Sequence, residues 1–318
     1  MSLSVGQKFK IAAKYYRNML QGRPYSINLE ITKKCNAKCD FCDYWKTKQE
    51  NVISDYGPIV KKIDPVMVTL TGGEPMLRTD IYDIIKNIRK AVPAVYMAMI
   101  NNGSLMTVEK AKKLLEAGMN QVAFSVDFLD DRHDKSRGIP GLWKHLTEII
   151  PQIAKLGFDS VQMNWIIMEE NFDQTEAAAK LCKEWGINIS YTSYSDLKNM
   201  NDSHFLSEPK MKQLPQVIEN LKQFKYKNRT VRSSDYYLNH IPQYYSGQKI
   251  PGCPAGLKWI QVTPEGWYKP CSELPPVTFW EDYDHKKSFK KQDCTLCWYG
   301  CRGENQTPID VQRIREFM

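Results

Sequence analysis

Short apolar runs alternate with amphipathic segments between residues 26 and 193 of this 318-residue sequence. The runs are rich in residues that favour strands, and they cover residues 27–32, 66–71, 95–100, 121–127, 161–167 and 187–193. The segments between them repeat apolar residues at helical spacing, in residues 56–63, 81–92, 108–117, 142–156 and 172–185. This alternation predicts an α/β domain with a parallel sheet, although periodicity alone does not distinguish a doubly wound sheet from a barrel.

The sequence on either side of this domain predicts further helices. Residues 8–20 read as a basic amphipathic helix whose apolar face carries Phe9, Ala12, Tyr16 and Met19. We favour a helix that packs on the domain over one that contacts a membrane surface. After residue 195 the chain is polar and aromatic with a helical pattern at 210–224, and we expect it to cover the open side of the domain.

Composition narrows the class of protein. No apolar stretch reaches the roughly 18 residues that span a bilayer, and the first ten residues lack the apolar segment of a signal peptide. Nine cysteines, several at C-x2-C spacing, indicate metal binding in a reducing compartment, so we expect a cytoplasmic protein. The net charge of +8 suits an anionic small molecule or surface. No nucleic-acid-binding motif is present, and we expect no nucleic-acid partner.

Three cysteines with C-x3-C-x2-C spacing follow the first predicted strand: Cys35, Cys39 and Cys42. A loop this short can place three thiolates on three irons of one cuboidal iron–sulfur cluster and leave the fourth iron open for a small molecule. Zinc is the competing interpretation, but zinc usually needs a fourth ligand nearby, and the next cysteine is Cys182.

The second predicted strand ends in Thr71-Gly72-Gly73-Glu74-Pro75. A C-x3-C-x2-C loop followed by a Gly-Gly-Glu-Pro motif at this separation resembles the radical S-adenosylmethionine (radical SAM) superfamily. The resemblance implies a partial (β/α)6 TIM-like barrel, a four-iron, four-sulfur (4Fe-4S) cluster on the three cysteines, and S-adenosylmethionine (SAM) on the open iron. In such folds the chemistry lies at the carboxyl ends of the strands.

The same resemblance suggests which side chains hold the cofactors. The expected SAM-binding residues are Phe41 against the adenine, Glu74 with the Gly72-Gly73 backbone at the methionine amino group, and also Asn102 and Ser125. Asn164, a polar side chain inside the fifth apolar run, is a further candidate, for which a role in the core is an equal alternative. Ser125-Val126-Asp127 resembles a Ser-x-Asp motif whose aspartate faces the substrate, which makes Asp127 a candidate catalytic residue. Arg137-Gly138 resembles a loop that often follows the fourth strand. We expect the five scattered histidines, His133, His145, His204, His240 and His285, at the surface.

A second group of cysteines lies near the end of the sequence: Cys253, Cys271, Cys294, Cys297 and Cys301. Pro264-Glu265-Gly266 predicts the turn of a hairpin between the first two. The group resembles the auxiliary-cluster region of the SPASM and twitch branch of the superfamily, and its five cysteines imply one auxiliary 4Fe-4S cluster. Cys253 and Cys271 would bind it with two of the other three. We favour Cys294 and Cys297, with Cys301 as a rival ligand or a hydrogen-atom donor.

Cys182 is the remaining unassigned thiol, and inside a predicted helix it is expected to be an inert core residue rather than a catalytic one. The expected organisation is an N-terminal basic helix, a radical SAM partial barrel, a connecting or lid region and a small cysteine-rich auxiliary-cluster domain, in residues 1–25, 26–200, 201–250 and 251–318.

The resemblance implies a reaction. A reduced cluster, supplied with electrons by a flavodoxin- or ferredoxin-type protein, would split SAM and give a 5′-deoxyadenosyl radical that removes a hydrogen atom from the substrate. We expect a redox modification of a small or medium metabolite, with the auxiliary cluster as electron acceptor. The alternatives are an epimerase, an enzyme that forms a C–C bond, and a peptide maturase. A zinc-binding interaction module is the alternative outside the enzymes.

Overall fold

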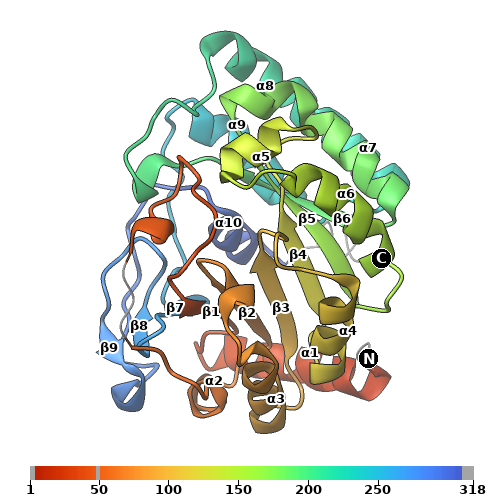
Figure 1. The fold of residues 1–318 in the computed structure, drawn as a ribbon. Helices are drawn as coiled ribbons and strands as arrows, with labels where there is room; N and C mark the ends of the chain where they lie inside the picture. Colours follow the sequence, from red (N-terminus) through yellow and green to blue (C-terminus); the bar gives the residue numbers. More distant parts are fainter. Residues whose placement is uncertain (1–3, 48–50, 310–318) are drawn as a thin grey trace.

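The computed structural model describes residues 4–47 and 51–309, and within them nine strands form one sheet in the order β6-β5-β4-β3-β2-β1-β7-β8-β9 (Figure 1). Neighbouring strands from β6 to β7 are parallel, and β8 and β9 are antiparallel. The strands are β1 Ser26–Thr32, β2 Met67–Gly72, β3 Tyr96–Asn101, β4 Gln121–Ser125, β5 Ser160–Ile167, β6 Asn188–Ser193, β7 Trp259–Val262, β8 Trp267–Lys269 and β9 Thr278–Phe279.

The helices connect the parallel strands and cover one face of the sheet. They are α1 Val5–Leu20, α2 Gly57–Ile63, α3 Ile81–Ala91, α4 Val108–Ala117, α5 Arg132–Arg137, α6 Leu142–Ile153, α7 Thr175–Trp185, α8 Glu208–Asn228, α9 Asp235–Tyr245 and α10 Gly300–Gln306. Short 3-10 turns at Tyr44–Lys46 and Asp196–Lys198 lie in two of the loops. Because successive side chains of a strand point to opposite faces, Ile27 and Leu29 of β1 are fully buried in the main core, while Asn28 and Glu30 face the other side.

The α/β fold with a parallel sheet is confirmed, and each predicted strand from β1 to β6 agrees within two residues. The sheet is not closed into a barrel, which agrees with a partial TIM-like fold. Three helices, α5, α9 and α10, lie where the sequence pattern predicted no helix. Within the described residues, no helix is both long enough and apolar enough to cross a membrane.

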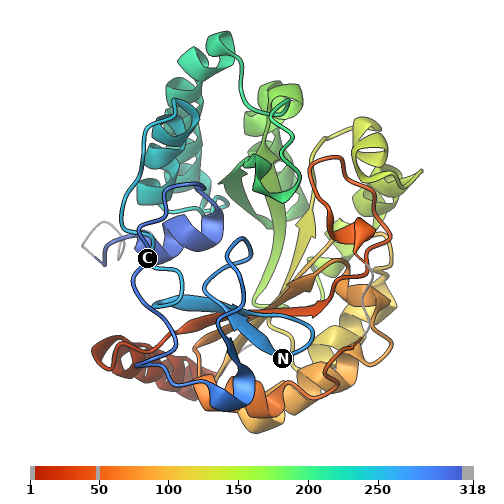
Figure 2. The same cartoon turned by 90° about the vertical axis from the view of Figure 1, so that its left-hand side faces the viewer.

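The C-terminal cysteine-rich region is joined to the main sheet. The predicted hairpin is present, with β7 antiparallel to β8. In addition, β7 pairs in parallel with β1, from Ser26 opposite Trp259 to Leu29 opposite Val262, and Figure 2 shows these C-terminal strands beside β1. The strands after residue 251 therefore extend the barrel sheet and do not form a sheet of their own. The domain boundaries given above stay predictions.

Candidate functional site

The loop after β1 and the turn after β2 hold each other by their backbones. Gly73 N–H donates to the carbonyl oxygen of Thr32 at 2.8 Å, and Glu74 N–H donates to that of Lys34 at 2.8 Å. A Cβ on Gly72 would lie 2.0 Å from the Thr32 oxygen, and one on Gly73 would lie 2.1 Å from the Lys34 oxygen. The two glycines are therefore required where the second motif packs against the start of the cysteine loop, residues 33–42.

Glu74 is a buried carboxylate beside this loop. Its two oxygens accept backbone N–H groups of Met76 at 3.0 Å and Asn102 at 2.7 Å. The Asn102 side chain donates to Asn36 Oδ1 in the cysteine loop at 2.9 Å. Burial raises the pKa of Glu74 to about 7. The two backbone hydrogen bonds and the charge of Arg137 act in the opposite direction and lower this pKa, but burial has the larger effect. A buried carboxylate with spare acceptor capacity favours binding of a cation such as an ammonium group.

Arg137 connects the loop after β4 to the cysteine loop. Its guanidinium donates to both carboxylate oxygens of Asp127, at 2.6 and 2.7 Å, and Nη1 lies 3.7 Å from the Sγ of Cys39. The Arg137 carbonyl oxygen accepts Lys38 N–H at 2.8 Å. Burial works against ionisation of Asp127, but the charge of Arg137 still holds the pKa of that carboxyl below its usual range. The ion pair therefore places a cation against one thiol of the motif.

This placement of Asp127 differs from the expectation that it faces a substrate. Its side chain is fully buried, and Ser136 also donates to it at 3.0 Å. His133 is likewise buried, and its Nδ1 accepts the Asp127 N–H at 3.2 Å. His204, also buried, contacts Glu170 at 2.9 Å. The prediction that all five histidines lie at the surface is wrong for His133 and His204, because each is buried and contacts a polar group of the protein.

Of the three thiols of the cysteine loop, Cys39 is buried and Cys35 and Cys42 are half-buried. Burial raises the pKa of Cys35 and Cys42, and it raises that of Cys39 to about 12. Ionised neighbours among the three raise these values further, which shows that the thiols lie within electrostatic reach of one another. A metal centre would have to displace the thiol protons, and Arg137 would then stabilise the resulting negative charge. These residues fit a 4Fe-4S cluster with three protein ligands.

The other expected SAM-binding residues lie on the same side of the sheet. Phe41 is half-buried, with the Arg137 guanidinium 5.5 Å from its ring centre. Ser125 and Asn164 are register partners on neighbouring strands and are also half-buried. The Asn164 side chain accepts a hydrogen bond from Gln162 at 2.7 Å. Their roles as SAM ligands stay predictions.

The C-terminal cysteines also come together. Cys253 packs with Ala255 and Trp259 in a small apolar cluster, against which three partly buried thiols lie: Cys271, Cys294 and Cys301. Burial raises the pKa of Cys297 to about 12 and that of Cys301 well above its usual range, and ionised thiols nearby raise both values further. Cys301 therefore belongs to the group as much as Cys297 does, so the choice of four ligands among the five stays open.

Arg302 is a fully buried cation beside these thiols. Its guanidinium donates to the carbonyl oxygens of Cys297 and Ile250 and contacts Gln306, and it lies 5.3 Å from the ring centre of Trp298. Within residues 4–47 and 51–309 no carboxylate forms an ion pair with it. A buried guanidinium without a counter-ion favours an anionic group nearby, so these residues fit a thiolate-bound iron–sulfur cluster.

Neither thiol group is arranged around a single ion. Across the described part of the chain, no three of the His, Cys, Asp and Glu side chains are grouped as ligands of one metal ion. An iron–sulfur cluster holds its thiolates on separate irons, so its sulfur ligands need not converge on one point. Cys182 lies apart from both groups, fully buried in α7 with its Sγ 3.7 Å from the sulfur of Met163.

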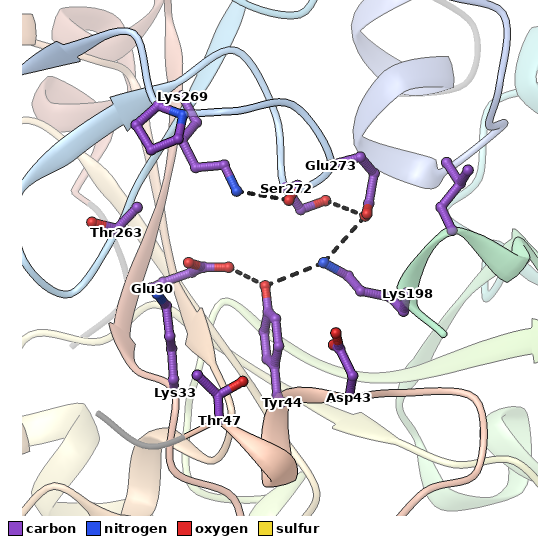
Figure 3. Close-up of a pocket in the computed structure, with 12 residues that line it drawn as sticks. Glu30, Lys33, Asp43, Tyr44, Thr47, Lys198, Thr263, Lys269, Ser272 and Glu273 are labelled. Atoms are coloured by element: carbon purple, nitrogen blue, oxygen red, sulfur yellow. Dashed lines mark hydrogen bonds and ion pairs between the residues drawn. The ribbon is translucent and has the colours of Figure 1, made fainter. Parts of the chain in front are cut away.

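A cavity of about 330 Å³ is lined by residues that closely follow Cys42 and Cys271 in the sequence (Figure 3). Its walls come from β1, from the 3-10 turn that follows Cys42, from the turn after β6, and from the segment around Cys271. The charged and phenolic side chains that line it are Glu30, Lys33, Asp43, Tyr44, Lys198, Lys269 and Glu273.

Four of these side chains, Glu30, Tyr44, Lys198 and Glu273, form one hydrogen-bonded network. Tyr44 donates to the buried Glu30 carboxylate, and Lys198 lies 3.4 Å from the Tyr44 hydroxyl and 3.2 Å from Glu273. Lys269 donates to the backbone oxygen of Ser272 at 2.8 Å. Burial and the charge of Glu30 raise the pKa of Tyr44 well above its usual range, so its phenol stays protonated. Burial also lowers the pKa of Lys269.

Sequence reasoning did not identify this cavity. A charged Glu30 inside an apolar strand was a usable signal, because a buried carboxylate needs a partner. No such signal marked Tyr44, Lys198 and Lys269, because they are far apart in the sequence and come together only in the folded protein.

Comparison with known proteins supports the fold and the first motif. Residues 29–182 match the family described as Radical SAM superfamily. The chain is 30% identical over 196 residues to the GTP 3′,8-cyclase of Aquifex aeolicus, which covers 58% of this chain and 61% of that protein. It is 25% identical over 187 residues to the GTP 3′,8-cyclase of Listeria monocytogenes, which covers 56% of each. The matched part thus spans about three fifths of these relatives.

Solved structures resemble the whole described fold. SuiB of Streptococcus suis bound to S-adenosylmethionine superposes with a TM-score of 0.66 at 15% identity, over 96% of this chain and 70% of that one. anSMEcpe with bound AdoMet and a Cp18Cys peptide superposes with a TM-score of 0.63 at 18% identity, over 84% and 80% of the two chains. At this identity the likeness shows the fold alone. The family match over residues 29–182 shows that the chain carries a radical SAM domain, and together with the similarity to the GTP 3′,8-cyclases it shows that the protein is an enzyme.

Proposed function

We propose that this enzyme carries out a redox modification of a small polar metabolite bound in the cavity of about 330 Å³ next to its two cysteine groups. The observation that carries the proposal is the position of that cavity. It is lined on one side by Tyr44, two residues after Cys42, and on the other by Ser272 and Glu273, directly after Cys271. A substrate there would lie next to both metal centres that the cysteines would hold. The volume suits a small molecule.

Cys35, Cys39 and Cys42 would hold the SAM-binding cluster, Glu74 the SAM ammonium group, and four of the five C-terminal cysteines an auxiliary cluster. When bound, these groups supply a radical that removes a hydrogen atom from the substrate and an acceptor for the electron left behind. The glycines of the second motif fix the cysteine loop in place. Arg137 and Arg302, both buried, stabilise negative charge at the two thiol groups.

The cavity side chains bind and orient the substrate. Among the hydrogen bonds and ion pairs of the described residues, the Lys269 ammonium group contacts only the neutral Ser272. Lys269 is therefore placed to bind an anionic group of the substrate. Glu30 is placed to accept a proton from the substrate, while Tyr44 holds its carboxylate and Lys198 holds Tyr44. A carboxylate in this position would take up the proton that leaves when a hydroxyl or amine carbon is oxidised.

The test is anaerobic reconstitution with iron and sulfide, followed by incubation with SAM, a reductant and pools of small polar metabolites. Mass spectrometry follows 5′-deoxyadenosine and the loss of two hydrogens from a metabolite. Replacing Cys35, Cys39 and Cys42 with Ala should abolish 5′-deoxyadenosine. Replacing Cys253 and Cys271 with Ala should abolish product while SAM cleavage persists, and Cys182→Ala is the matched thiol control. A protein that binds zinc and no iron would refute the proposal.

A second candidate is cyclisation of a nucleotide, which the names of the two sequence relatives favour. Product mass separates the two candidates, because a cyclisation that only rearranges bonds leaves the substrate mass unchanged, whereas oxidation removes two hydrogens. Incubation with GTP and SAM is therefore part of the same assay.

A further inference from the structure

The first helix, α1 Val5–Leu20, is attached to the rest of the chain by its polar side. Lys14 forms an ion pair with Asp64 at 2.7 Å and donates to the backbone oxygen of Ala94 at 2.8 Å. Asn18, fully buried, donates to the backbone oxygen of Asp64 at 2.9 Å. These contacts fix the rotation of the helix about its axis.

The opposite side of α1 is apolar and exposed. Five large apolar side chains, which we call the apolar stripe, lie on it: Val5, Phe9, Tyr16, Met19 and Leu20. Phe9 is 72% exposed and Leu20 is 83% exposed. At 3.6 residues per turn, these positions fall on one arc of the helix. An ordinary surface helix shows the reverse arrangement, with its apolar side inward, so the stripe calls for a partner.

Charge on the two edges of the stripe indicates which partner. Lys8 lies beside Met19 at one edge and Lys10 lies about 80° beyond Leu20 on the other side, and both are exposed. The helix Val5–Leu20 contains no Asp or Glu. An exposed apolar arc with lysines on both sides is the arrangement of helices that lie in the interface of an anionic membrane. Two copies of α1 facing each other would bring these lysines together with no acid on either helix.

We propose that α1 docks the enzyme on an anionic lipid surface through the apolar stripe. The helix contacts residues just before β2 and β3, at the amino ends of the strands, and it lies at the lower edge of the molecule in Figures 1 and 2. The cavity lies at the carboxyl ends. Docking would therefore leave the cavity away from the lipid. The proposal does not depend on the proposed reaction.

The experiment is co-sedimentation of the anaerobically reconstituted 318-residue protein with vesicles of phosphatidylcholine alone or mixed with equal parts of phosphatidylglycerol. The protein should bind the anionic vesicles, and Phe9→Ser with Leu20→Ser should weaken binding more than about tenfold, since two large apolar side chains leave the lipid. Lys8→Ala with Lys10→Ala should weaken binding to the anionic vesicles and make it less sensitive to salt. Val52→Ser with Met200→Ser, two exposed apolar residues elsewhere, is the matched control.

Three outcomes would overturn the proposal. The first is no binding to anionic vesicles by the unaltered protein. The second is equal loss of binding in the stripe variant and in the control variant. The third is a dimer, seen by light scattering, that Phe9→Ser with Leu20→Ser dissociates in the absence of any vesicle binding, because the stripe would then cover a second copy. Circular dichroism of each variant checks that the fold is retained.

Discussion

Replacing Asp127 with Asn removes the counter-charge of a buried arginine. The Asp127–Arg137 pair has two hydrogen bonds, of 2.6 and 2.7 Å, and side chains that are 0% and 10% exposed. An asparagine would turn an amide N–H₂ toward a guanidinium that has only donors. Breaking a buried pair on one side costs about 3–5 kcal/mol. For 318 residues, that corresponds to a fall in Tm of about 4–7 °C.

The chain offers a matched control three residues after Asp127. Asp130 and Arg132 make the same two-point contact, at 2.8 and 2.7 Å, but their side chains are 37% and 47% exposed. Asp130→Asn should therefore cost about 1 kcal/mol or less. Urea denaturation of the reduced apoprotein, followed by circular dichroism, measures both free energies of unfolding. Equal losses in the two variants would refute the claim that burial, rather than the contact itself, makes the first pair strong.

The pH dependence of the same pair has a definite sign. The pKa of Asp127 is held below its usual range in the folded protein, so the pair contributes fully above about pH 4 and loses its contribution as pH falls through the depressed value. The stability difference between the unaltered protein and Asp127→Asn should therefore shrink toward acid pH. A difference that stays constant down to low pH would contradict this assignment.

Three further predictions concern the cofactor sites. The pKa of Glu74 is about 7, so its ionised fraction should rise about tenfold from pH 6 to pH 8. The affinity for SAM, measured by equilibrium dialysis, should rise by the same factor, and Glu74→Gln should remove that rise. Gly73→Ala, whose Cβ would press on the Lys34 backbone, should lower iron content, whereas Gly6→Ala, with open space around it, should not. With the proposed auxiliary cluster on the C-terminal thiols, Arg302→Met should lower iron content by about four per chain in an iron analysis, because that cluster would be lost.

The fold could be predicted from sequence where local pattern decides it. The strands and most helices follow from the spacing of apolar residues, and α4 agrees at both ends because Thr107 caps its start and Gly118 its end. The short helix α5, Arg132–Arg137, has no apolar period, since its residues are nearly all polar. It is held instead by its ion pair to Asp127 and by Asp134, which accepts the backbone N–H of Trp143 at 2.7 Å.

The site could be predicted only in part, for a similar reason. Cysteine spacing and the Gly-Gly-Glu turn are local signals, and the structure brings Glu74, Asn102 and the cysteine loop together. The contact of Arg137 with a thiol and the contact of Arg302 with the Ile250 carbonyl oxygen join residues that are far apart in the sequence. Both arginines matter because they are buried, and the residues next to them in the sequence do not indicate that burial.

Strand β1 explains why the cavity lies next to both cysteine groups. It pairs with β2 on one side and with β7 on the other, all in parallel, so the carboxyl ends of these three strands meet at one edge of the sheet. The cysteine loop leaves β1 there and Glu74 follows β2, whereas β8 runs antiparallel to β7 and carries the chain back to Cys271, which packs near Trp259 at the start of β7. Glu30, near the end of β1, lines the cavity. A change that breaks the β1–β7 pairing should therefore disturb substrate binding before it disturbs the cysteine loop, which Gly73 and Glu74 hold independently from β2.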